Sequence, residues 1–191
     1  MPERQLIMSA RIITHEQLDR RLDVLAKHPK RFTEAAKKLA AEFDAKGLHL
    51  EISDPQTWRQ PADAAREPSR ITFENQLRTE IDRIQIMGRE DEMRLARRIE
   101  FARVRLDRAL AEAGLSGADL AAGVPHLPSM YLGPMYLGAG PGDCSLPAQV
   151  CRAWMEWHSL RLEMVERNLY LVLINVERYA HTTVGLSLIH I

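Results

Sequence analysis

The arginines of residues 78–108 are best suited to chemistry in this sequence, and the chemistry that they suit is binding. A guanidinium group pairs with phosphate and stacks on unpaired bases, so such a run suits a surface that touches DNA. Most of these arginines also have a Glu or Asp three or four residues away, which is typical of a solvated helix face whose charges neutralise one another. Both interpretations of the arginine run stay open at this point.

Residue patterns for catalysis or metal binding are missing. The 7 histidines are scattered, and none forms an H-E-x-x-H pair or a cluster with cysteine. Cys144 and Cys151 match no metal-ligand spacing, and Ser145 has no nucleophile elbow around it. The glycines of YLGAGPG follow no predicted strand, so they do not indicate a phosphate loop. We therefore expect a protein that is not an enzyme and uses no metal, cofactor or small-molecule substrate.

Charge and hydropathy limit the possible partners. Because 26 basic residues balance 26 acidic ones, contact with nucleic acid would need a local patch. The longest apolar run, at 169–174, is far shorter than the roughly 20 residues that span a bilayer, and the first residues do not form a signal peptide. These features, with only two cysteines, predict a soluble cytoplasmic chain with reduced thiols and no membrane partner.

Local signals predict two helices and a strand near the start of the chain. Thr14 and Gln17 form a capping box that opens the first helix. Thr33 is the expected cap of the second helix, and Gly47 its expected stop. Apolar and polar residues alternate at 48–52, which predicts a short half-buried strand.

The remaining elements are predicted to be helices separated by a Gly/Pro-rich insert. One helix begins at Thr72 and ends near Gly88, and a second ends at Gly114, with arginines on its outer face. The composition after Gly114 disfavours helix, and Pro147 begins a long final helix. The predicted fold class is all-α. A small unit of two helices and a ribbon is expected at 1–54, followed by a linker at 55–70 and a helical segment at 71–113. The insert then covers 114–147, and the final helix covers 148–191.

The final helix carries two amides in its apolar arc, Asn168 and Asn175. A buried amide without partners costs several kcal/mol, so each should hydrogen-bond to a neighbouring helix end or loop. Direct contact with a partner molecule is the alternative interpretation.

Two segments carry a family resemblance. EIDRIQIMGREDEMRLARRIE at 80–100 and ERNLYLVLINVERY at 166–179 resemble, in that order, two segments of the sigma-seventy family of bacterial sigma factors. In that family the second segment is the first helix of the domain that binds core RNA polymerase and melts the promoter. The resemblance implies that the chain is an N-terminal piece of such a factor, with its last helix exposed and a terminal LSLIHI that does not continue the family pattern.

The resemblance also implies partners and site residues. Sigma factors bind core RNA polymerase and recognise promoter DNA, and their segment equivalent to 75–83 lies beside the unpaired non-template strand. The DNA-binding residues that it implies are Asn75, Gln76, Arg78, Thr79 and Arg83. The alternative is a helical adaptor that binds another protein through its apolar faces and does not bind DNA.

Overall fold

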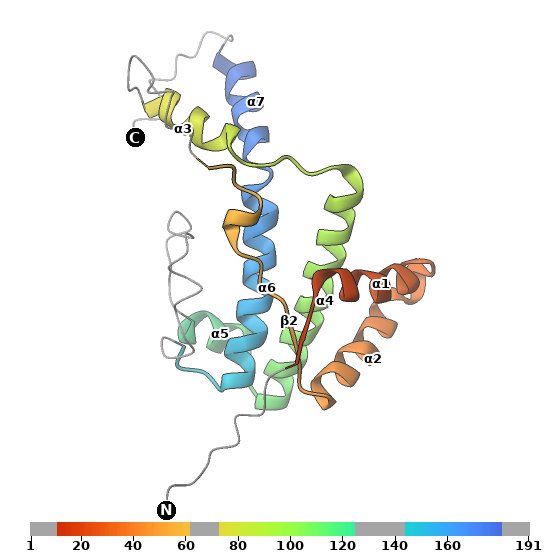
Figure 1. Cartoon of the computed structure of the whole chain (residues 1–191). Coiled ribbons are helices and arrows are strands. Elements are labelled where there is room, and N and C mark those ends of the chain that lie inside the picture. Colours follow the sequence, from red (N-terminus) through yellow and green to blue (C-terminus); the bar gives the residue numbers. More distant parts are fainter. Residues whose placement is uncertain (1–10, 62–72, 125–143, 181–191) are drawn as a thin grey trace, which may run out of the picture.

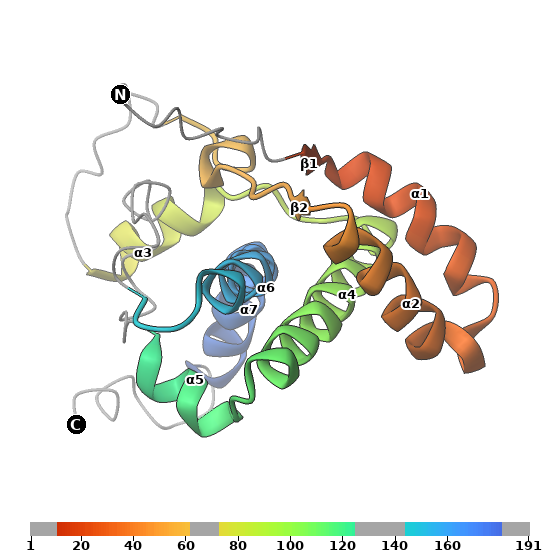
Figure 2. The same ribbon diagram turned by 90° about the horizontal axis from the view of Figure 1, so that it is seen from below.

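A long central helix, α4 (Arg89–Ala113), organises the fold and is packed on two sides. The computed structural model describes residues 11–61, 73–124 and 144–180. Helices α1 (His15–Ala26) and α2 (Phe32–Ala45) cover one side of α4, and α6 (Ala148–Glu166) covers the other (Figures 1 and 2). The predicted all-α class is confirmed, and a two-stranded sheet is the exception among the described residues.

The N-terminal unit follows most of its local signals. Thr14 and Gln17 form the predicted capping box, and Gly47 ends the second helix with a φ of 61°, a conformation that favours glycine. Thr33 is not the cap of α2: the helix begins one residue earlier, because a 3-10 helix, η1 (Pro29–Arg31), leads straight into it. The predicted strand is β2 (Leu48–Leu50), which pairs in parallel with an unpredicted strand, β1 (Arg11–Ile13).

The hydrophobic core lies on both sides of α4. Phe43 of α2 and Phe101 of α4 are fully buried and meet edge to face, with ring centroids 5.4 Å apart. On the other side, α4 and α6 bury Leu106, Val150 and Trp154. Since α4 is covered from two directions, its arginines cannot all face solvent, as the sequence had suggested.

The long final helix predicted from Pro147 is two helices. α6 ends at Glu166, and α7 (Leu169–Ala180) begins after a short turn. α3 (Phe73–Asp82) ends earlier than expected and lies beside α7, the helix that follows α6 (Figure 1).

The predicted linker and insert contain ordered structure where they are described. Residues 55–57 form a 3-10 helix, η2 (Pro55–Thr57), and Trp58 after it is buried. Within the insert, Ser116 and Asp119 form a capping box that begins α5 (Gly117–Gly123), so the prediction of a non-helical insert is wrong there. Residues 62–72 and 125–143, and the terminal LSLIHI, lie outside the described residues.

Cys144 and Cys151 form a disulfide in the structure. The expectation of two reduced thiols is therefore wrong for this structure. The sequence could not show it, because the pairing depends on how the segment before α6 folds back on the first turn of that helix.

No helix among the described residues is long and apolar enough to cross a bilayer.

Candidate functional site

The residues implied to bind DNA gather on one side of α3. Asn75, Gln76, Arg78 and Thr79 are all exposed. At 100° per residue they share one arc of the helix, whereas the buried Ile81 lies on the opposite arc. The structure thus brings these four side chains to one surface, while the apolar side of α3 packs on the protein. Their contact with DNA stays a prediction.

Arg83 connects the end of α3 to the segment after η2. Its Nε donates to the carbonyl oxygen of Gln60 at 2.9 Å, and its Nη1 pairs with Glu80 at 3.0 Å. The backbone reinforces this connection, since the Gln60 N–H donates to the Arg83 carbonyl and the Gln85 N–H to the Trp58 carbonyl, both at 2.8 Å. Arg83 is therefore already engaged within the protein.

An ion pair and a hydrogen bond fix this end of the molecule to the end of α6. Arg59 pairs with Glu166 in the last turn of α6. Arg167, which follows that turn, donates its Nε to the Gln85 carbonyl at 3.3 Å and pairs with Glu163 at 3.1 Å. These contacts position α3 where it meets α7.

α7 presents apolar side chains to solvent beside α3. Leu171, Val172 and Ile174 are 44%, 51% and 47% exposed. Single exposed aliphatic residues are common, but three within four residues form an apolar cluster on one helix, with the exposed Asn175 among them. We call these three residues the α7 surface. These exposed side chains agree with the prediction that the last helix is exposed.

The two asparagines of the final segment differ in their environments. Asn168 lies in the turn between α6 and α7, and its Nδ2 donates to the Met164 carbonyl at 2.8 Å. This contact confirms the predicted hydrogen bond to a helix end. Asn175 is exposed instead of buried, because the described residues do not cover that side of α7.

Six arginines of α4, at positions 94, 97, 98, 103, 105 and 108, are paired within the protein. Arg98 binds Asp19 of α1 with two hydrogen bonds, and Arg97 and Arg94 pair with Asp23 of the same helix. The prediction that these arginines all lie on an outer face is wrong, because Arg98 and Arg105 point inward beneath α1 and α2. The sequence left two interpretations of the arginines open, a DNA-binding surface or charges that neutralise one another. The second describes α4.

The innermost of these pairs forms a buried charge network. The Glu156 side chain is 1% exposed and accepts hydrogen bonds from the Leu50 N–H at 2.9 Å and from Arg105 Nη1 at 2.5 Å. Arg105 also donates to the Leu48 carbonyl at 2.8 Å and pairs with Asp44 at 3.0 Å. Burial raises the pKa of Glu156 to about 7, against the lowering effect of the Arg105 charge and the Leu50 N–H. This network joins β2 and α2 to the α4–α6 pair.

Sequence reasoning missed Glu156, although one signal was available. Glu156 lies in the run Trp154-Met155-Glu156-Trp157, where it is the one charged residue among apolar neighbours. An acid in that position needs a buried cation, which Arg105 supplies.

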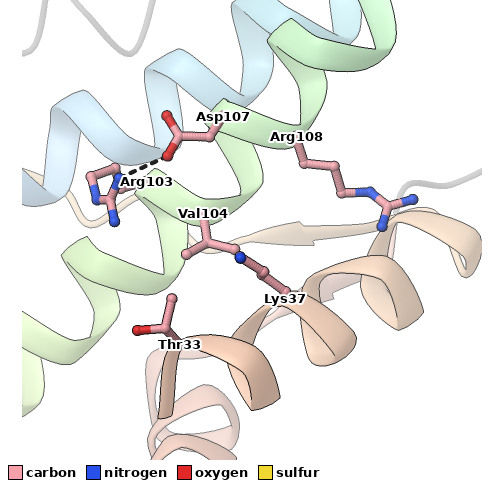
Figure 3. A pocket seen from close by; sticks show the side chains of 6 residues that line it. All are labelled: Thr33, Lys37, Arg103, Val104, Asp107 and Arg108. Carbon is pink, nitrogen blue, oxygen red and sulfur yellow. Dashed lines mark hydrogen bonds and ion pairs between the residues drawn. The ribbon is translucent and has the colours of Figure 1, made fainter. Parts of the chain in front are cut away.

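A groove between α2 and α4 has a volume of about 530 Å³. Figure 3 shows Lys37 and Thr33 on one wall, with Arg103, Asp107 and Arg108 spread along the other. Each cation here already has an acidic partner: Glu34 for Lys37, Glu100 and Asp107 for Arg103, and Asp44 and Glu112 for Arg108. The groove therefore offers little uncompensated charge to a ligand.

No family model matches the chain, and no curated protein or solved structure is detectably similar to it. The class of protein is thus defined by the fold alone: an all-α protein whose described surface pairs a polar helix face on α3 with the apolar α7 surface.

Proposed function

We propose that this chain belongs to a sigma-type transcription initiation factor, in which α3 faces the non-template strand of promoter DNA and α7 faces core RNA polymerase. The observation that carries the proposal is the position of α3 beside α7, with the polar arc of one and the apolar surface of the other both exposed. Residues distant in the sequence thus form one composite surface.

The residue types on this surface suit the two partners. Asn75, Gln76 and Arg78 offer amide and guanidinium groups, which can hydrogen-bond to unstacked bases and pair with phosphates. Because the net charge of the chain is zero, such a contact relies on this local group of side chains. The α7 surface suits packing against protein, since its exposed side chains are aliphatic.

The second candidate is a protein-binding adaptor that does not touch DNA. The α7 surface favours it, because an apolar surface alone is sufficient for an adaptor. The pairing of the α4 arginines also favours it, since it removes much of the cationic surface that the sequence had suggested for DNA.

Site-specific crosslinking separates the two candidates. A photoreactive residue would replace Gln76, and the protein would be mixed with core polymerase and promoter DNA carrying a melted bubble. Lys38 is the matched control, because it is a polar residue equally exposed on another helix, α2.

A sigma-type factor should crosslink to the non-template strand from position 76 and not from position 38. Copurification with the polymerase should accompany this crosslink. If the chain neither copurifies with polymerase nor crosslinks more from position 76 than from position 38, the transcription proposal is wrong and the adaptor is favoured.

A further inference from the structure

A second cavity, of about 330 Å³, lies directly above the buried charge network, where α2, β2, α4 and α6 meet. Its floor includes Asp44 and Arg105, which neutralise each other. Its other lining residues come from the turn into β2, from α4 and from the first turns of α6: Gly47, Leu48, His49, Ala109, Ala148, Gln149, Arg152 and Ala153. Three of the lining residues, Ala109, Ala148 and Ala153, have small side chains.

Arg152 brings an exposed guanidinium to this cavity. Its side chain is exposed, and within the described residues it has no hydrogen bond and no ion pair. The charge of Arg152 is felt at His49, which also lines the cavity. The pKa of the His49 ring is lowered, mainly by burial and secondly by the positive charge of Arg152. The His49 Nδ1 atom is buried without a hydrogen-bond partner, 3.8 Å from Glu156 Oε1.

Neither Asp44, which lines the cavity, nor the nearby Glu156 forms an ion pair with Arg152 among the described residues. Asp44 is already shared by Arg105 at 3.0 Å and Arg108 at 3.3 Å, and Glu156 is held by Arg105 and the Leu50 N–H. In the groove between α2 and α4, by contrast, each lining cation has an acidic partner. Figure 3 shows one of these pairs, Arg103 with Asp107. Within the described residues, Arg152 therefore lines this cavity without a hydrogen bond or ion pair of its own.

We infer that this cavity binds a small organic anion, whose carboxylate or phosphate group pairs with Arg152 and whose apolar body lies against the alanines. A planar guanidinium suits both oxyanions, because it offers two parallel N–H donors. Ala109, Ala148 and Ala153 supply an apolar wall, and the volume lies at the small end of the range for small-molecule sites. The inference does not depend on the proposed role in transcription.

Benzoate and phenyl phosphate test this inference, because they share a phenyl ring and differ only in the oxyanion. Each would be titrated into the intact chain at constant ionic strength, with amide NMR shifts and calorimetry as readouts. We expect saturable binding with shifts centred on residues 47–49 and 148–153. The two probes decide which oxyanion the cavity prefers.

Three variants make the test specific. Arg152→Gln should weaken binding about tenfold or more, since it removes a charge-assisted bidentate contact. Ala148→Trp should weaken it similarly by filling the cavity from an exposed position on the first turn of α6. Arg161→Gln is the matched control, because Arg161 lies on the same helix but its guanidinium stacks on Trp157.

The control variant should bind as the unmodified chain does. The inference is wrong if neither probe saturates, or if Arg161→Gln weakens binding as much as Arg152→Gln does. The second result would show a nonspecific effect of surface charge.

Discussion

Asp19 and Arg98 are joined by two parallel hydrogen bonds across the interface between α1 and α4. Arg98 Nε and Nη2 donate to the two carboxylate oxygens of Asp19 at 2.7 and 2.5 Å, and these side chains are 11% and 15% exposed. The N-terminal unit is thus fixed to the central helix by a buried ion pair as well as by its apolar core.

Replacing Asp19 by Ala should lower the free energy of unfolding by about 3 kcal/mol, because it leaves the Arg98 guanidinium buried without its partner. Urea unfolding measures this change. Glu16→Ala is the control: it breaks the exposed pair of Glu16 and Arg20 on the same helix and should change stability little. Equal effects of the two variants would contradict the role given to Asp19.

Glu156 should make stability depend on pH. Its pKa is raised from 4.5 to about 7 in the folded state, so between these values the folded chain binds the proton more tightly than the unfolded chain. The free energy of unfolding should therefore fall as pH rises from about 4.5 to about 7, by up to about 3 kcal/mol from this group.

The difference between the original chain and Glu156→Gln isolates this contribution. His49 and His158 have lowered pKa values, mainly through burial, so they act in the opposite direction. Chemical unfolding across the pH range measures the difference. A difference that does not change with pH would show that Glu156 is not protonated in this range.

Arg78→Ala should weaken promoter complexes of the polymerase-bound protein and reduce the slope of log affinity against log salt by about 1, since one phosphate contact is lost. Fluorescence anisotropy at several salt concentrations measures both effects. Arg83 is not used for this test, because it also holds the segment around Gln60. Arg20→Ala, at an exposed position of α1, should leave the slope unchanged.

Val172→Asp should reduce copurification with core polymerase while leaving the free energy of unfolding nearly unchanged, because the Val172 side chain is half exposed on α7. Val24→Asp is the matched control, since Val24 is a valine of similar exposure on α1. Polymerase retention and urea unfolding, measured together, separate a lost contact from a lost fold. Unchanged retention of Val172→Asp would remove α7 from the polymerase interface.

Reduction of the disulfide between Cys144 and Cys151 should destabilise the folded chain by about 2 kcal/mol, because the bond closes a short loop in the unfolded state. Thermal unfolding with and without reductant measures the effect. Cys144→Ser should match the reduced chain and be insensitive to reductant. Two thiols that react in the unfolded chain without reductant would show that the bond is not formed.

Local sequence signals determined several elements correctly, because each depends only on residues within one or two turns. The capping box of Thr14 and Gln17 starts α1 as expected, and Gly47 and Gly114 end their helices in the left-handed conformation. The polar residues of α3 were implied by the family resemblance, and the structure places them on one exposed arc of the helix, away from the buried Ile81.

Tertiary structure decided where the charges of those helices point. Acids three or four residues from the α4 arginines suggested pairing along one helix, yet Arg98 and Arg105 bind Asp19 and Asp44, 79 and 61 residues away. The burial of Glu156 and the cavity at Arg152 likewise arise only where α2, β2, α4 and α6 meet. Periodicity shows which residues share a helix face, whereas burial and ion pairing depend on which distant segment covers that face.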